Sequence, residues 1–213
     1  MKFEELLNIS SGEPVFETGL LLAGDVKPAD VRKQLSRWVS TGKIYKLRRG
    51  LYALAPPHLK VKPHPFLVAN RLVPASYVSL QSALAYYGLI PEYVPVTTSV
   101  TTWRAGRWDT PLGVFLYRHF QKSNLTGYRL IDLGDGQHAL LATPEKALLD
   151  LIYLTPGGDS PDFLTGLRLQ NLDSLNLKGM RDLTARLGSK KLVRAVERIA
   201  SAVSLESKEY EPL

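Results

Sequence analysis

Residues 27–58, KPADVRKQLSRWVSTGKIYKLRRGLYALAPPH, combine a high positive charge with a change from helical to strand-like spacing of apolar residues. They hold eight basic residues against one acid, so their net charge of +7 equals the formal charge of the whole chain of 213 residues. The residues before them are acidic overall, and those after them carry a weaker basic excess over a much longer stretch. A positive field concentrated on one short segment suits a phosphate backbone. The sequence therefore predicts a nucleic-acid contact here.

The first part of this segment is expected to form a helix. Pro28 fits the first helical position, where its missing N–H costs nothing, and Gly42 fits the left-handed position just past the end. Val31, Leu35 and Trp38 follow at helical spacing and form one apolar stripe. Polar and basic side chains lie away from this stripe: Arg32, Lys33, Ser36, Arg37 and Ser40. An ordinary amphipathic surface helix has the same pattern, so the helix alone does not establish a DNA contact.

A hairpin is predicted directly after this helix. Residues 43–47 and 51–54 have the alternating or continuous apolar pattern of short strands. Arg48, Arg49 and Gly50 join them, and Gly50 supplies the positive φ that a tight turn needs. Two arginines at the tip of a hairpin can contact phosphates beside a groove that a helix occupies.

The elements upstream complete a winged helix-turn-helix. A first helix is expected around residues 4–9, a short buried helix at 18–23, and a turn at Gly24 and Asp25. The helix after Gly24 and Asp25 is then expected to read bases in the major groove, while the wing holds backbone or minor groove. The residues expected to contact double-stranded DNA are Lys27, Arg32, Lys33, Ser36, Arg37, Ser40, Lys43, Lys46, Arg48 and Arg49.

The run from residue 20 to residue 54 resembles the N-terminal winged-helix domain of AbiE-type (AbiEi-like) antitoxins, the repressors of bacterial type IV toxin–antitoxin and abortive-infection operons. Residues 77–91, 97–101 and 142–150 resemble later landmarks of that family, so the resemblance covers most of residues 15–155. It implies that the chain represses its own operon, through an operator with inverted repeats. It also implies that the C-terminal domain neutralises a cognate nucleotidyltransferase-like toxin, without necessarily forming a stable complex.

Two other classes of function remain as alternatives. The chain could be a winged-helix regulator without a toxin, whose second domain is a sensor or an assembly module. A DNA-directed nuclease is disfavoured because no convincing metal constellation is present. A nucleotidyltransferase reading frame immediately downstream of the gene would favour the antitoxin.

The composition suits a protein of the bacterial interior. At 45% hydrophobic residues, the chain can bury one large core or two modest ones. The absence of cysteine excludes disulfides and thiolate metal sites and is compatible with a reducing cytosol. The N-terminus is too acidic for a signal peptide, and no stretch approaches the ~18–20 apolar residues of a membrane span. We expect a soluble, cytoplasmic protein with no membrane contact.

Two domains are predicted, with a boundary at the proline-rich segment 55–65. Prolines at this density end both helices and central strands, so the chain divides into a winged helix over residues 1–58 and a larger mixed α+β domain over residues 59–213. Few contacts are expected across such a linker. In the second domain, helices are predicted at 66–72, 79–88, from 143 onward and at about 189–204, and strands at about 94–102, 112–119, 127–133 and 137–142.

No catalytic, metal or cofactor site is expected. The four histidines are scattered, and no nucleophile elbow, phosphate-cradling loop or dinucleotide fingerprint is present. Asp132 with Glu145 and Lys146 resembles the carboxylates and lysine of a nuclease. However, Glu145 and Asp150 also suit the start and the exposed face of a helix. The chain is therefore predicted not to be an enzyme.

Two further groups of residues have two interpretations each. Trp103, Arg104, Arg107 and Trp108 are predicted to form a strand–turn–strand tip, which is either a stabilising cation–π cluster or a contact surface for protein or nucleic acid. In the last helix, a basic stripe is either a solvated face or a second surface for DNA or an acidic partner. Its members are Lys190, Lys191, Arg194 and Arg198.

Overall fold

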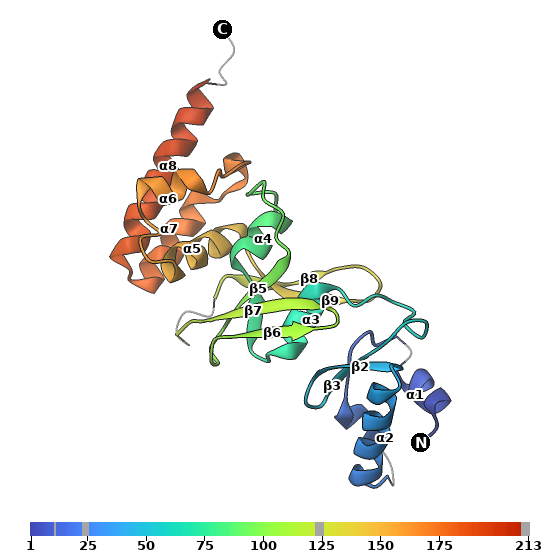
Figure 1. Cartoon of the computed structure of the whole chain (residues 1–213). Coiled ribbons are helices and arrows are strands. Elements are labelled where there is room, and N and C mark those ends of the chain that lie inside the picture. Colours follow the sequence, from blue (N-terminus) through green and yellow to red (C-terminus); the bar gives the residue numbers. More distant parts are fainter. Residues whose placement is uncertain (11, 23–25, 122–125, 210–213) are drawn as a thin grey trace.

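The computed structural model describes residues 1–10, 12–22, 26–121 and 126–209 and shows a mixed α+β protein with two sheets (Figure 1). The smaller sheet is antiparallel, with strand order β1-β3-β2. The N-terminal elements are α1 (Phe3–Ile9), β1 (Phe16–Glu17), the 3₁₀ helix η1 (Thr18–Leu22), α2 (Pro28–Ser40), β2 (Ile44–Arg48) and β3 (Leu51–Leu54). They form the lower right part of the molecule in Figure 1.

The predicted helix and hairpin of the basic segment are confirmed as α2, β2 and β3. Pro28 occupies the start of α2, and Gly42 follows its C-cap with φ +69°. Gly50, with φ +82°, lies in the turn between β2 and β3. The short buried helix predicted at 18–23 is the 3₁₀ helix η1, which ends at Leu22 and buries only Leu21. The predicted turn at Gly24 and Asp25 lies outside the described residues.

The larger sheet has six strands in the order β6-β7-β5-β4-β9-β8. Its β5–β7 and β4–β9 pairs are parallel, and the other neighbours are antiparallel. The strands are β4 (Ser76–Val78), β5 (Val96–Thr101), β6 (Gly106–Thr110), β7 (Gly113–His119), β8 (Tyr128–Asp132) and β9 (His138–Ala142). The helical elements are α3 (Pro65–Leu72), α4 (Leu80–Tyr86), α5 (Pro144–Leu154), α6 (Pro161–Gly166), η3 (Leu172–Ser174), α7 (Leu177–Leu187) and α8 (Lys190–Glu209).

Helices cover both faces of the larger sheet. The buried Tyr117 of β7 donates a hydrogen bond of 2.7 Å to the carbonyl of Ala69 in α3, which places α3 on one face. The side chain of Thr98 in β5 points to the face opposite Tyr117 and forms a hydrogen bond of 3.1 Å with the hydroxyl of Ser82 in α4. The helices α4 and α5 therefore cover this other face. Beyond α5, the helices α6, α7 and α8 form a further layer (Figure 1).

The core of the larger sheet continues across the proline-rich segment into the N-terminal hairpin. Leu47, Leu51 and Ala53 of β2 and β3 belong to the same cluster of buried residues as the α3 residues Val68 and Leu72. The two predicted domains therefore share part of one buried cluster, and the division at residue 58 stays a prediction. A second, smaller cluster packs α1, α2 and η1 on the other side of the hairpin.

Two strands of the larger sheet do not follow from the sequence pattern. β4 is only three residues long, and β6 has the sequence GRWDT, whose glycine and charged residues read as a turn. Residues 102–105 connect β5 to β6, so the expected tip lies between two strands, with Arg107 and Trp108 within β6. An exposed edge strand needs no apolar face, so its sequence gives a weak signal.

The expectation that Asp150 lies on an exposed helix face is also wrong, since Asp150 and Lys146 are both fully buried. All residues of α5 from 146 to 152 are buried, so the helix has no exposed face there. The ammonium of Lys146 bonds to one carboxylate oxygen of Asp150. The hydroxyls of Tyr77 and Ser79 donate to the other, at 2.9 and 2.8 Å. Ser79 holds the N-cap position of α4, as predicted, but its hydroxyl bonds to Asp150 instead of capping the helix.

This buried group joins three elements of the core. Burial raises the pKa of Asp150, while the Lys146 ammonium and the two hydroxyl donors act in the opposite direction. Burial and the charge of Asp150 raise the pKa of Tyr77, which keeps its hydroxyl a donor. The Lys146 ammonium also lies 4.4 Å from the centre of the Phe120 ring. β4, α4 and α5 are thus fixed to one another by a fully paired polar group.

Replacing Asp150 by alanine is expected to lower the free energy of unfolding by about 3–5 kcal/mol, because it leaves the Lys146 ammonium buried without its counter-charge. The matched control is Arg181→Ala, which removes an exposed ion pair with Glu197 and is expected to cost less than about 1 kcal/mol. Urea titrations followed by circular dichroism measure both. Equally small losses for the two variants would contradict a structural role for the buried pair.

Candidate nucleic-acid interface

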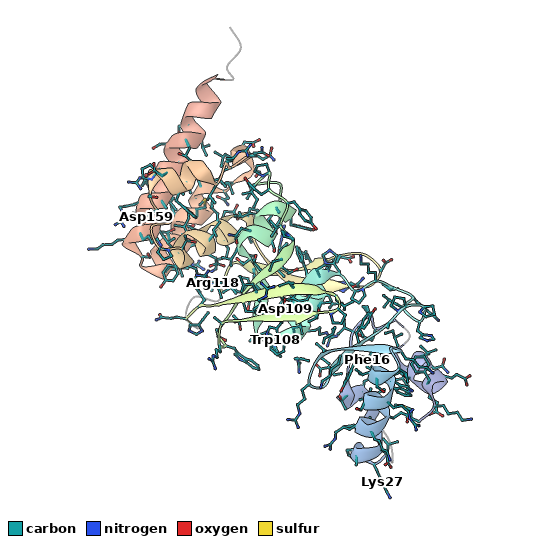
Figure 2. All side chains as sticks on the ribbon, in the orientation of Figure 1. Phe16, Lys27, Trp108, Asp109, Arg118 and Asp159 are labelled. Carbon is teal, nitrogen blue, oxygen red and sulfur yellow. The ribbon has the colours of Figure 1, made fainter. Side chains whose placement is uncertain are left out.

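The outer face of α2 is exposed and the inner face is buried. Val31, Leu35 and Trp38 pack into the smaller core, and Leu35 is fully buried. The ring of Phe3 in α1 meets the Trp38 indole edge-on at 5.3 Å, which closes this core from one side. The α2 residues predicted to contact DNA all have exposed side chains, and so does Lys27 at the helix start: Lys27, Arg32, Lys33, Ser36, Arg37 and Ser40. Figure 2 places Lys27 at the end of α2 that lies farthest from the larger sheet.

The cations on this face have no acidic partner within the described part of the chain. Arg32, Lys33 and Arg37 form no ion pair or side-chain hydrogen bond there, and the same holds for Lys46 and Arg49. The Ser40 hydroxyl differs, because it donates to the Arg37 carbonyl at 2.8 Å. An exposed cation without an intramolecular partner keeps all its donors for phosphate or base edges.

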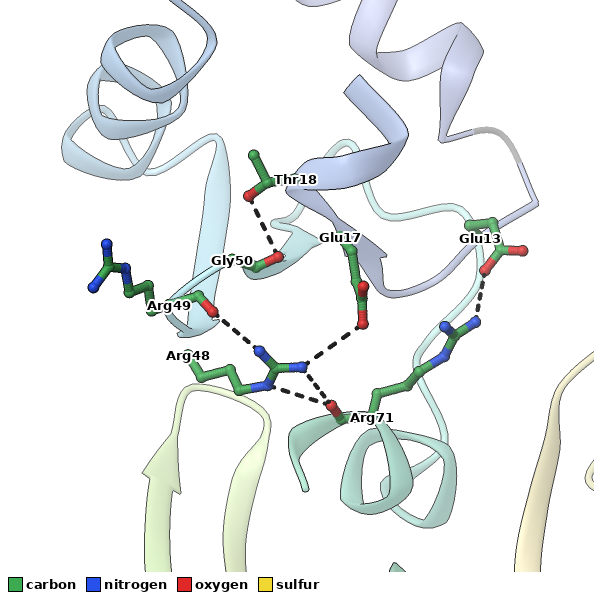
Figure 3. A network of polar contacts seen from close by, with 7 residues as sticks. All are labelled: Glu13, Glu17, Thr18, Arg48, Arg49, Gly50 and Arg71. Atoms are coloured by element: carbon green, nitrogen blue, oxygen red, sulfur yellow. Dashed lines mark hydrogen bonds and ion pairs between the residues drawn. The ribbon is translucent and has the colours of Figure 1, made fainter. Parts of the chain in front are cut away.

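Arg48 is held by protein groups, although the sequence predicts it as a DNA contact. Its guanidinium donates to the carbonyl of Arg71 at 3.2 and 3.4 Å and to the carbonyl of Arg49 at 3.1 Å (Figure 3). It also lies 3.7 Å from the carboxylate of Glu17. Arg71 itself pairs with Glu13 at 3.5 Å. The guanidinium of Arg49 points away from this network in Figure 3, so Arg49 is the wing arginine that faces solvent.

The two lysines of the hairpin also differ. Lys43 is half-buried, and its ammonium lies 4.7 Å from the centre of the Phe3 ring, so it contacts α1. Lys46 is exposed on β2. Of the ten predicted contacts, the structure therefore leaves Lys43 and Arg48 occupied by protein groups and the rest on the surface.

Sequence reasoning misses the partners of Arg48. Arg71 lies in the last turn of α3, 23 residues away along the chain, and Glu17 lies in β1. No periodic pattern links these positions, because only the folded chain brings the wing onto the end of α3. The helix end contributes a carbonyl without an intrahelical partner, which suits a guanidinium donor.

The basic stripe of α8 is largely occupied by intramolecular contacts. Lys191 donates to the carbonyls of Tyr153, at 3.2 Å, and Thr155 at the end of α5. Arg194 pairs with the carboxylate of Asp159 at 2.7 Å and lowers the pKa of that group. Arg198 donates to the Asp159 carbonyl, whereas Lys190 is exposed. Figure 2 shows Asp159 beside α8, so the stripe fastens α8 to the segment after α5.

The first of the two interpretations of the tryptophan and arginine group, a cation–π cluster, does not hold among the described residues. Arg107 instead makes a two-pronged ion pair with Asp109, with its closest N–O distance at 2.8 Å. In the part of the chain that the structure describes, no cation lies over the ring of Trp103 or Trp108. Trp103 is 55% exposed and Trp108 is 36% exposed. The alternative interpretation, a contact surface, stays a prediction.

Comparison with known proteins does not identify the chain: no family model matches it, and neither does any curated protein. Among the described residues, no helix is both long enough and apolar enough to cross a membrane. Within the same residues, histidine and carboxylate side chains do not gather in groups of three or more that could hold a metal ion. A functional proposal therefore depends on the geometry of this chain and on its sequence resemblance.

The two arginines of the hairpin are expected to differ in how much their replacement lowers the free energy of unfolding. Arg48→Ala removes hydrogen bonds to two carbonyls and is expected to lower the free energy of unfolding by about 1 kcal/mol or more. Arg49→Ala, one residue away and exposed, is expected to change it by no more than about 0.5 kcal/mol. Chemical denaturation of the two variants gives the comparison. A larger loss for Arg49 would show that the Arg48 contacts are not those that hold the wing.

Proposed function

We propose that this chain is a DNA-binding transcriptional regulator with an N-terminal winged helix, in which α2 enters the major groove and the β2–β3 hairpin is the wing. The observation that carries the proposal is the set of exposed, unpaired cations that α2 and the hairpin share. Among the described residues, this set comprises Arg32, Lys33, Arg37, Lys46 and Arg49. Within the described ranges of the chain, no acidic partner neutralises it, so its field is available to an anionic polymer.

The order of elements supports this proposal. A first helix, a short second helix, the exposed helix α2 and a two-stranded hairpin follow one another within residues 3–54, as in a winged helix. An α-helix fits the major groove of B-DNA, which is about 12 Å wide. Arg32, Lys33 and Arg37 are then the candidates for base edges, and Lys46 and Arg49 for phosphates.

The sequence resemblance to AbiE-type antitoxins supports a more specific form of the proposal. The chain binds an operator of its own operon, with inverted repeats, and represses it. Its C-terminal domain neutralises a cognate nucleotidyltransferase-like toxin, and a stable complex is not required. In this form the protein is not an enzyme, and its action is cytoplasmic.

One observation favours the alternative, a regulator whose C-terminal domain senses a small molecule. A cavity of about 290 Å³ lies between the larger sheet and the helices α4 and α5. Apolar residues such as Val96 and Leu116 line it together with Arg107 and Arg118. Apolar walls with two guanidinium groups suit a small organic anion. Arg118 already donates to the Leu154 carbonyl at 2.7 Å, so such a ligand would share this arginine with α5.

DNA binding should depend steeply on salt. If all five unpaired cations neutralise nearby phosphates, including the three on α2 that also reach base edges, log K is expected to fall with log[salt] with a slope of roughly −4 to −5. Arg37→Ala is expected to cost about 1–3 kcal/mol and to relax the preference at particular bases, whereas Arg49→Ala weakens all sequences alike. Fluorescence anisotropy on selected duplexes measures both effects. Retained affinity with a slope near zero would rule out the electrostatic interface.

Growth rescue separates the antitoxin from the sensor. Co-expression of this chain with a nucleotidyltransferase encoded beside it should restore growth, also for the variant Lys33→Glu with Arg37→Glu, because neutralisation is assigned to the C-terminal domain. Protein levels must be matched, since repression controls expression. Loss of rescue in this variant at equal abundance would make DNA binding part of neutralisation. No rescue by the unaltered chain would favour the sensor.

A further inference from the structure

β6 is an exposed edge of the larger sheet. In the part of the chain that the structure describes, Gly106–Thr110 pairs with β7 alone, and β6 stands at the end of the strand order (Figure 1). The four residues from Gly106 to Asp109 are all exposed, and Trp108 projects from the strand at the rim of the sheet (Figure 2). An edge of this kind presents unpaired backbone groups to any strand that can align with them.

The outward-facing backbone groups of β6 belong to Arg107 and Asp109. A two-residue turn joins β6 to β7, and Thr110 stands opposite Gly113 across it. Residues that flank a two-residue turn exchange backbone hydrogen bonds, and bonded and non-bonded pairs then alternate along the ladder. Trp108 is therefore bonded to β7, while the N–H and C=O groups of Arg107 and Asp109 point to the open edge.

The side chains of β6 are self-complementary about Trp108. When two copies of β6 pair antiparallel with Trp108 opposite Trp108 of the second copy, Arg107 stands opposite Asp109 of the second copy, on the same face. In the same register, Arg107 and Asp109 of the second copy form a backbone hydrogen-bonded pair. The two tryptophans form a non-hydrogen-bonded pair, the type in which opposite side chains approach most closely. Backbone direction, charge and aromatic contact thus agree on one register.

We propose that β6 is a homodimerisation edge, through which two copies of this chain join their larger sheets into one continuous sheet across a two-fold axis at Trp108. Arg107 and Asp109 already pair within each copy, and in the dimer each also faces its opposite charge in the second copy. The proposal does not depend on DNA binding, although a two-fold dimer matches an operator with inverted repeats.

The other edge of the sheet does not share this property. β8 has the sequence YRLID, and its Leu130 is 64% exposed. A two-fold axis at Leu130 places Arg129 opposite Ile131, and an axis at Arg129 places two arginines opposite each other. An axis at Ile131 places Asp132 opposite Leu130. No centre on β8 therefore pairs opposite charges.

The ends of β6 restrict assembly to a closed pair. Pro111 follows the strand and lacks an N–H, so the added ladder cannot extend past it. Charges on an edge strand commonly prevent pairing, because like charges or lysines on two edges repel each other. In β6, one cation and one anion stand at equal distances from Trp108, so a second copy of the strand meets opposite charges. A symmetric contact uses the same surface on both copies and leaves none for a third.

Sedimentation of the full chain in low salt, over a wide range of concentrations, tests the proposal. The unaltered chain is expected to reach twice its mass of 23.7 kDa. Asp109→Arg and Arg107→Asp each place like charges opposite each other and are expected to weaken dimerisation at least tenfold. Combining the two substitutions restores opposite charges and should restore the dimer. Arg181→Glu, which disrupts an exposed ion pair on α7, is the matched control and should leave the mass unchanged.

Asp109→Pro tests the backbone part of the contact. It removes an N–H that points to the open edge and leaves the ladder to β7 in place, so it should abolish the dimer without lowering the unfolding midpoint by more than Asp109→Ala does. A monomer at every concentration would overturn the proposal. So would a dimer that persists in both single charge variants and in Asp109→Pro, because the contact would then lie elsewhere.

Discussion

The burial of the apolar stripe of α2 determines the direction in which the basic side chains of this helix point. Val31, Leu35 and Trp38 are buried beneath α2, so the rotation of this helix about its axis is set by the small core. With that rotation fixed, Arg32, Lys33 and Arg37 must face away from the protein. The orientation of the surface proposed to bind DNA therefore follows from the burial of the apolar stripe. No ion pair is needed to orient α2.

Arg48 connects this surface to the rest of the molecule. Its bonds to the Arg71 carbonyl and its approach to Glu17 hold the wing against the end of α3, and buried leucines of the hairpin extend the larger core. The hairpin thus has one face in each core. These contacts provide a continuous packed connection between α3 and the hairpin that is proposed to contact DNA.

The sequence predicts the elements that depend on local patterns and misses those that depend on assembly. α2 and the hairpin follow from periodicity, a proline start and two glycines with positive φ, all of which are local. Asp150 is misassigned because its burial depends on helices and strands that cover α5 on every side. The role of Arg48 depends on Arg71, far along the chain. β6 is missed because an edge strand can be polar on both faces, and periodicity then carries no signal.

Charge reversal on α2 tests the central claim most directly. The measurement is binding of a labelled duplex from the region upstream of the gene, by the unaltered chain and by Lys33→Glu with Arg37→Glu. The matched control reverses Lys178 and Arg186, two exposed cations on α7. The α2 variant is expected to bind at least about a hundredfold more weakly with an unchanged unfolding midpoint, and the control to bind as the unaltered chain does. Equal affinity of the unaltered chain and the α2 variant would contradict the proposal that α2 binds DNA.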